Sequence, residues 1–86
     1  LPPQLRQLIS YRDLEPGEVL FQQGDEAIAF FVVETGRVRL VRYSSDGKEV
    51  TFQITRSGES LAEIALFSNN YPCAAVAEVA SRVIVY

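Results

Sequence analysis

The sequence predicts one small, mainly β domain of the sandwich or barrel class. Short apolar or alternating runs are separated by turn residues about every 8–12 positions, which is typical of antiparallel sandwiches and barrels. Although 48% of the 86 residues are apolar, no apolar run approaches the ~20 residues that a membrane-spanning helix needs. A chain of this length buries roughly 60–65% of its unfolded surface, which is enough for one modest core.

The first third of the chain contains one expected helix and one short strand. Two prolines precede residues 4–9, where Leu and Ile recur at helical spacing, so a short amphipathic N-terminal helix is expected there. Residues 15–18 (EPGE) predict a turn, because proline presets φ and glycine accepts positive φ. Residues 19–21 (VLF) predict a brief strand that ends at a second turn, residues 23–25.

The middle of the chain predicts three strands. Residues 29–33 (AFFVV) are an apolar, β-rich run too short for a helix, which indicates a buried strand. After Gly36, residues 37–40 alternate arginine with apolar residues, as a half-buried strand does. The SSDG segment at 44–47 predicts a hairpin whose second strand is 50–55. In that strand Val50, Phe52 and Ile54 alternate with Thr51, Gln53 and Thr55.

Residues 75–79 and 82–86 predict two further strands. The last of these contains apolar residues that need cover, and the chain begins at Leu1 and contains no Met. We therefore expect residues 1–86 to be a single truncated domain of a longer protein.

Residues 58–75 (GESLAEIALFSNNYPCAA) predict a short helix and a loop between two strands, with Glu63 inside the helix. This layout suits a phosphate–sugar site, in which helix N–H groups face an anion and a carboxylate accepts a hydrogen bond from a ribose hydroxyl. The segment is the strongest candidate for a ligand site in the sequence.

Composition excludes several functions. The net charge of −3 argues against direct nucleic-acid binding, which requires clustered Lys and Arg. The single cysteine, Cys73, cannot form an internal disulfide, so a reducing cytoplasm is expected. The absence of histidine removes Ser–His and Cys–His nucleophile pairs and the imidazole ligands of metal-dependent barrels. We therefore expect neither an enzyme nor a metal site.

Several short motifs follow one another without gaps through most of the chain, beginning just before residue 19 and ending before residue 79. They are the Pro16-Gly17 turn, Phe21 with Gln23-Gly24, Phe31-Val32-Val33 before Gly36, Asp46-Gly47-Lys48, Gly58, Ala62-Glu63, Ala65-Leu66-Phe67 and Ala75. On these residues the chain resembles the cyclic-nucleotide-binding β-roll, particularly the sensor domains of the CRP/FNR transcription regulators. The resemblance implies a jelly roll (double-stranded β-helix) with a short helix in the phosphate-binding cassette.

In family members that bind cyclic AMP, the cassette carries Gly-Glu and, about ten residues later, Arg-Ser or Arg-Ala. The glutamate contacts the ribose 2′-hydroxyl and the arginine pairs with the phosphate. Here Glu63 matches, but Ala62 replaces the glycine and Cys73 stands where the arginine belongs, followed by Ala74. A charge-assisted contact of this kind is worth roughly 1.5–3 kcal/mol, so we expect a degenerate pocket that binds a cyclic nucleotide poorly and no other cofactor. The candidate pocket residues are Leu61, Ala62, Glu63, Ile64, Ala65, Cys73 and Ala74.

Each of these features also has a simpler interpretation. Glu63 could only stabilise the first turn of its helix, and Cys73 could be a small buried residue or a redox-active thiol. The arginines of strand 37–42 indicate a solvated strand face, the alternative being an anion or partner surface. Four residues follow helical spacing and indicate core or the walls of an apolar effector pocket: Leu61, Ile64, Leu66 and Phe67.

The resemblance implies a sensor domain that responds to a small-molecule effector by shifting against a helix that follows the roll. In the family this helix forms a homodimer and leads to a helix-turn-helix module that binds DNA. Both would lie beyond residue 86, so contact with DNA is expected only through that missing module, and no contact with a membrane is expected. Two alternatives remain: the same roll fused to an enzyme, channel or transporter, and an interaction module whose pocket is filled.

Overall fold

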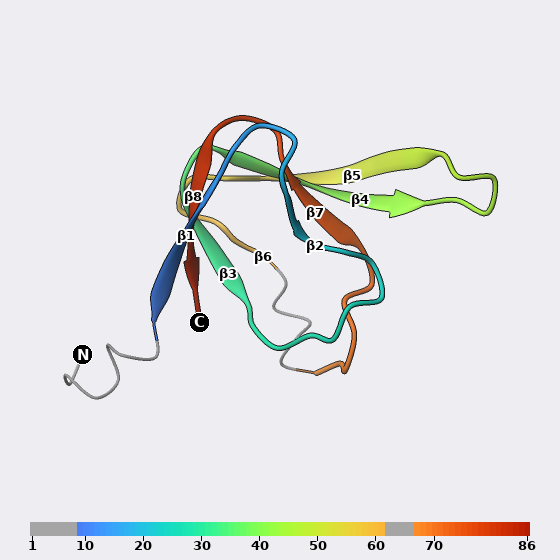
Figure 1. The fold of residues 1–86 in the computed structure, drawn as a ribbon, viewed down its shortest axis with the longest axis horizontal. Coiled ribbons are helices and arrows are strands. Elements are labelled where there is room, and N and C mark those ends of the chain that lie inside the picture. The colour runs from blue at the N-terminus through green and yellow to red at the C-terminus, as the bar shows by residue number, and fades with distance from the viewer. Residues whose placement is uncertain (1–8, 62–66) are drawn as a thin grey trace.

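The computed structural model describes residues 9–61 and 67–86, and these form two four-stranded antiparallel sheets. One sheet has the strand order β1-β8-β3-β6 and the other the order β2-β7-β4-β5. Apart from the β4–β5 hairpin, neighbours in each sheet come from distant parts of the sequence, as in a roll (Figure 1). The strands are β1 (Ser10–Leu14), β2 (Val19–Phe21), β3 (Phe31–Thr35), β4 (Arg37–Tyr43), β5 (Glu49–Arg56), β6 (Ser60–Leu61), β7 (Ala74–Ala77) and β8 (Ser81–Val85).

This architecture confirms the mainly β fold class. Strand β2 has the expected bounds, and β7 and β8 each begin one residue before the expected strands. The expected N-terminal helix at 4–9 falls almost entirely on residues 1–8, and the expected cassette helix falls on residues 62–66. Both segments lie outside the described residues. No helix in the described ranges has the length and hydropathy needed to cross a membrane.

Two strands are not expected from the sequence. Strand β1 carries mostly polar residues and has no apolar alternation, yet it pairs with β8 along its full length, from Ser10 opposite Val85 to Leu14 opposite Ser81. Strand β6 pairs with β3, with Leu61 opposite Phe31. Leu61 therefore lies in a strand and not in the helical pattern that the sequence indicates.

Strand β3 begins at Phe31, two residues later than expected, because Ala29 has another bonding partner. The hydroxyl of Tyr71 donates to the carbonyl oxygen of Ala29 at 2.6 Å, and the N–H of Ala29 points to the same hydroxyl oxygen at 3.2 Å. A side chain thus takes the place of a neighbouring strand at this residue.

The core lies between the two sheets and follows the alternation of the strands. In β4, Val38 and Leu40 face inward, and in β7 their partners Ala77 and Ala75 do the same. Burying this apolar surface is the main stabilising contribution. The buried core cluster contains Leu14, Leu20, Phe21, Phe31, Val33, Val38, Leu40, Leu61, Tyr71, Cys73, Ala75, Ala77 and Val83.

The β4–β5 hairpin projects beyond the rest of the roll (Figure 1). The expected turn is confirmed: the N–H of Gly47 donates to the carbonyl of Ser44 at 2.9 Å. The polar–apolar alternation of β5, however, does not mark its buried face. Val50 and Phe52 are 54% and 48% exposed, whereas Thr55 is only 1% exposed. Thr55 lies opposite buried Val38, near the end of β5 that is inside the roll, while Val50 lies in the projecting part.

Thr55 provides a first prediction. Its hydroxyl oxygen is buried and has no hydrogen-bond partner among the described residues. Because an unsatisfied buried polar group costs about 1–3 kcal/mol, we expect Thr55→Val to raise the free energy of unfolding by about 1 kcal/mol in urea titrations. Thr51→Val, at an exposed position of the same strand, should have little effect. A loss of stability in Thr55→Val would contradict this and indicate that the hydroxyl is satisfied.

Candidate functional site

The described structure frames the candidate cassette from both ends. Leu61, at the end of β6, and Cys73, immediately before β7, are buried in the same core cluster. The side chain of Ala74 packs separately, with Val41 and Val76 in a second cluster. The four pocket candidates between these ends, Ala62, Glu63, Ile64 and Ala65, lie outside the described residues. Phe67, expected as core or pocket wall, is instead exposed.

Backbone hydrogen bonds tie the last part of the cassette loop to the loop between β2 and β3. The N–H of Ala27 donates to the carbonyl of Asn69 at 2.8 Å, and the N–H of Tyr71 donates to the carbonyl of Asp25 at 2.9 Å. The side-chain amide of Asn70 also donates to the carbonyl of Gly24 at 2.9 Å. These bonds hold residues 69–71 against the loop between β2 and β3, and the Phe67 side chain before them is exposed to solvent.

Tyr71 anchors the loop from the inside. Its buried ring stacks on Phe21 with a centroid distance of 4.0 Å, and Phe21 in turn stacks on Phe31 at 5.8 Å. Together with the two hydrogen bonds to Ala29, this fixes the chain two residues before Cys73. The tyrosine ring and hydroxyl are therefore the groups that hold this part of the loop.

Cys73 is a free cysteine that is only 6% exposed. Burial raises the pKa of its thiol because it disfavours the charged thiolate, and the positive charge of Arg42 opposes this shift only in part. The thiol is therefore neutral near pH 7. These surroundings favour the small apolar interpretation over a redox-active thiolate.

Arg42 is the residue that the sequence pattern does not connect with this site. Strands β4 and β7 are paired with Val41 opposite Ala74. Because successive residues of a strand point to opposite faces, Arg42 and Cys73, which adjoin this pair, lie on the same face of the sheet. The Arg42 side chain is exposed there and the Cys73 side chain is buried. Only the strand pairing reveals this, since 31 positions separate the two residues in the sequence.

The other two arginines of β4 have partners on the outer face. Arg37 lies 3.7 Å from the carboxylate of Glu78, and Arg39 forms a hydrogen-bonded ion pair with Glu49. These two residues fit the solvated strand face that the sequence indicates. Arg42 is also exposed but has no ion-pair partner among the described residues.

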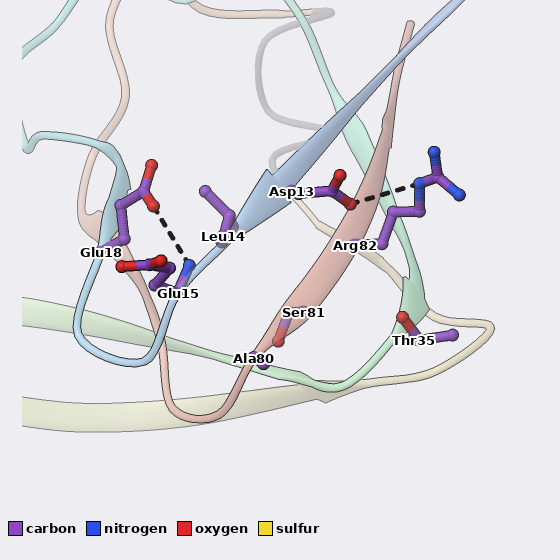
Figure 2. Close-up of a pocket in the computed structure, with 8 residues that line it drawn as sticks. All are labelled: Asp13, Leu14, Glu15, Glu18, Thr35, Ala80, Ser81 and Arg82. Atoms are coloured by element: carbon purple, nitrogen blue, oxygen red, sulfur yellow. Dashed lines mark hydrogen bonds and ion pairs between the residues drawn. The ribbon is translucent and has the colours of Figure 1, made fainter.

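The structure also has an open hollow of about 600 Å³ that is lined by β1, the turn after it, and β8 (Figure 2). Three of its four charged side chains have partners: Arg82 pairs with Asp13 at 3.3 Å, and Glu18 accepts a hydrogen bond from the N–H of Glu15 at 3.1 Å. The complete lining is Asp13, Leu14, Glu15, Glu18, Thr35, Ala80, Ser81 and Arg82.

This hollow is at the opposite end of its sheet from the cassette. Leu61 pairs with Phe31 at the start of β3, whereas the hollow adjoins Thr35 at the end of the same strand. No cluster of metal-ligating side chains occurs there or elsewhere in the described ranges. We therefore place the candidate ligand site at the cassette and not in this hollow.

Comparison with known proteins places this geometry in a family. Residues 11–86 match the family described as the cyclic nucleotide-binding domain. Among curated proteins, acetyltransferase Pat of Mycolicibacterium smegmatis is 42% identical over 52 residues, which are 60% of this chain and 15% of that protein.

Solved structures show the same relationship. The sensor domain of the transcriptional regulator DNR from Pseudomonas aeruginosa superposes with a TM-score of 0.87 and 30% identity, over 99% of this chain and 60% of that one. Catabolite activator protein from Thermus thermophilus superposes with a TM-score of 0.83 and 29% identity, over 99% of this chain and 42% of that one. The chain thus spans less than two thirds of each of these proteins. It belongs to the cyclic nucleotide-binding domain family, and its structural relatives are sensor domains of CRP/FNR transcription regulators.

Proposed function

We propose that residues 1–86 are the effector-sensing domain of a CRP/FNR-type transcription regulator and that the effector binds at the cassette, residues 61–74. The observation that carries this proposal is the superposition on the DNR sensor domain over 99% of the chain. The domain itself is not an enzyme and acts in the cytoplasm. A homodimerisation helix and a DNA-binding module lie outside residues 1–86.

The pocket in this proposal comprises the seven residues named from the sequence, with Glu63 as the acceptor for a ligand hydroxyl. The described residues support this location because both ends of the segment are fixed: Leu61 by its pairing with β3, and residues 69–71 by the loop between β2 and β3. Effector occupancy would shift the roll against the dimerisation helix.

A second candidate function is regulation of an enzyme in the same chain. The 42% identity with acetyltransferase Pat over 52 residues favours it, because this matching segment is only 15% of that protein. The two candidates share the ligand site and differ only in what the domain controls. Effector-dependent binding to DNA by the full protein distinguishes them.

Calorimetric titration with cyclic AMP and cyclic GMP tests the site. We expect weak binding by the unmodified chain and at least about tenfold tighter binding by Cys73→Arg, because an arginine–phosphate hydrogen bond contributes about 1.5–3 kcal/mol. Cys73→Gln introduces comparable bulk without charge and should show no gain. Circular dichroism checks that both variants fold. If folded Cys73→Arg binds neither nucleotide, the cassette is not a nucleotide-type site and the proposal fails.

A further inference from the structure

Arg42 has no ion-pair partner in the part of the chain that the structure describes. Four other arginines each have a carboxylate partner within 3.7 Å. The pairs are Arg12 with Glu18, Arg37 with Glu78, Arg39 with Glu49 and Arg82 with Asp13. In a chain of net charge −3, an arginine without a carboxylate partner is available to pair with an anion from outside the described residues.

The strand pairing brings Arg42 close to the position where the cassette lacks its cation. Val41 is directly opposite Ala74, and directly opposed residues of an antiparallel pair have Cβ atoms roughly 4.5–5.5 Å apart. Arg42 follows Val41 and Cys73 precedes Ala74, so Arg42 and Cys73 are neighbours on the same face of the sheet. The positive charge of Arg42 acts on the Cys73 thiol, which places the exposed guanidinium within electrostatic range of position 73.

Phe52 orients the guanidinium of Arg42. The guanidinium carbon is 5.1 Å from the centroid of the Phe52 ring, within the range of a cation–π contact. Phe52 lies at the irregularity where β5 has an additional residue relative to Leu40 and Val41. The ring is 48% exposed, so it retains apolar surface that a ligand can contact beside the cation.

We propose that Arg42 supplies, from strand β4, the cation that the cassette lacks at Cys73, and that this face binds a phosphate ester whose planar part contacts Phe52. This inference rests on the proposed function, because it assigns the ligand class of the same cassette. It changes which strand holds the anion: the contact comes from β4 in the projecting hairpin and not from the start of β7. The bound ligand would then contact the β4–β5 hairpin directly.

The experiment is a calorimetric titration of the full chain with cyclic AMP, and with adenosine as a ligand of the same base without phosphate. Arg42→Gln removes the charge and keeps most of the side-chain length. Arg56→Gln is the matched control, since Arg56 is an exposed arginine of the neighbouring strand with no carboxylate partner among the described residues. Circular dichroism confirms that both variants are folded.

We expect Arg42→Gln to weaken cyclic AMP binding about 10- to 100-fold, the range of a charge-assisted hydrogen bond, and Arg56→Gln to leave it unchanged. Binding of cyclic AMP should also weaken with added salt, and this dependence should be smaller in Arg42→Gln because a charge pair has been removed. A merely structural role for Arg42 would not alter the salt dependence. Adenosine should bind the unmodified chain more weakly than cyclic AMP does.

The Cys73→Arg background separates this inference from the proposed function. With an arginine at position 73, Arg42→Gln should weaken cyclic AMP binding much less than it does in the unmodified chain, because both cations would contact the same anion. If Cys73→Arg gains affinity while Arg42→Gln matches the unmodified chain, the cassette stands and the role of Arg42 is overturned. The role of Arg42 is also overturned if Cys73→Arg binds and the unmodified chain does not. If neither the unmodified chain nor folded Cys73→Arg binds, the proposed function fails and this inference fails with it.

Discussion

Gly36→Ala is expected to lower the free energy of unfolding by about 3 kcal/mol, which is a large part of the stability of a domain this small. Gly36 connects β3 to β4 with φ = +94°, and a Cβ atom there would lie 2.2 Å from the Ser81 hydroxyl oxygen and 2.7 Å from the carbonyl oxygen of Ala80. The left-handed conformation costs about 1–2 kcal/mol for a non-glycine residue, and overpacking adds typically 1–3 kcal/mol.

The clash in Gly36→Ala cannot be relieved cheaply. Ser81 is buried, its hydroxyl accepts a hydrogen bond from the N–H of Arg37 at 3.1 Å, and it donates to the carbonyl of Val79 at 2.8 Å. Moving the hydroxyl therefore disturbs the start of both β4 and β8. Urea titration and thermal melting measure the effect, and the melting temperature should fall by roughly 15 °C.

Gly47→Ala is the matched control for Gly36→Ala. Gly47 has φ = +83°, but an added Cβ would meet nothing within 4 Å. Only the backbone strain remains, so we expect a loss of about 1 kcal/mol. Equal losses in the two variants would show that the close approach to Ser81 does not contribute, and that backbone conformation alone explains the glycine.

Tyr71→Ala is expected to lower the free energy of unfolding by about 3–5 kcal/mol, the range for deleting a buried aromatic side chain. The change removes the ring that stacks on Phe21 at 4.0 Å and the hydroxyl that bonds both backbone groups of Ala29. Because these contacts hold the cassette loop to the loop between β2 and β3, the variant should also expose the amides of residues 69–71. Hydrogen exchange of those amides, together with urea titration, measures both effects.

Two variants divide the contribution of Tyr71 into its parts. Tyr71→Phe keeps the stacking and loses the hydroxyl, which leaves the part-buried groups of Ala29 without their partner, so we expect a loss of about 1–2 kcal/mol. Tyr43→Ala removes an exposed tyrosine and should change stability by less than about 0.5 kcal/mol. If Tyr71→Ala changed the free energy of unfolding as little as Tyr43→Ala does, Tyr71 would not anchor the loop.

Much of the fold is predictable because its signals are local. The SSDG hairpin turn and strand β2 lie where the sequence predicts them, since turn residues and short β-rich runs act over a few positions. Strand β1 is not predicted because it has no local signal. It is mostly exposed and polar, and it forms because its backbone pairs with β8. Pairing between segments about 70 residues apart leaves no pattern in either segment alone.

The face of β5 cannot be predicted from its alternation. The sequence places Val50, Phe52 and Ile54 on one side and Thr55 on the other, yet Thr55 is buried and Val50 is exposed. Two structural facts reverse the expected pattern: β5 has an irregularity opposite Leu40 and Val41, and the hairpin projects past the sheet that would have covered it. An added residue moves every later side chain relative to its partners.

The mainly β architecture follows from the sequence, because glycine positions, turn residues and apolar runs specify it locally. The family follows from the resemblance of these motifs, and the cassette at 58–75 stays a prediction. The resemblance also implies that Cys73 stands where family members have a phosphate-binding arginine. The surroundings of Cys73, in contrast, depend on how distant strands pair. Antiparallel pairing of β4 with β7 brings Arg42 to the same face, and backbone hydrogen bonds across strands create such neighbours without any signal in the sequence between them.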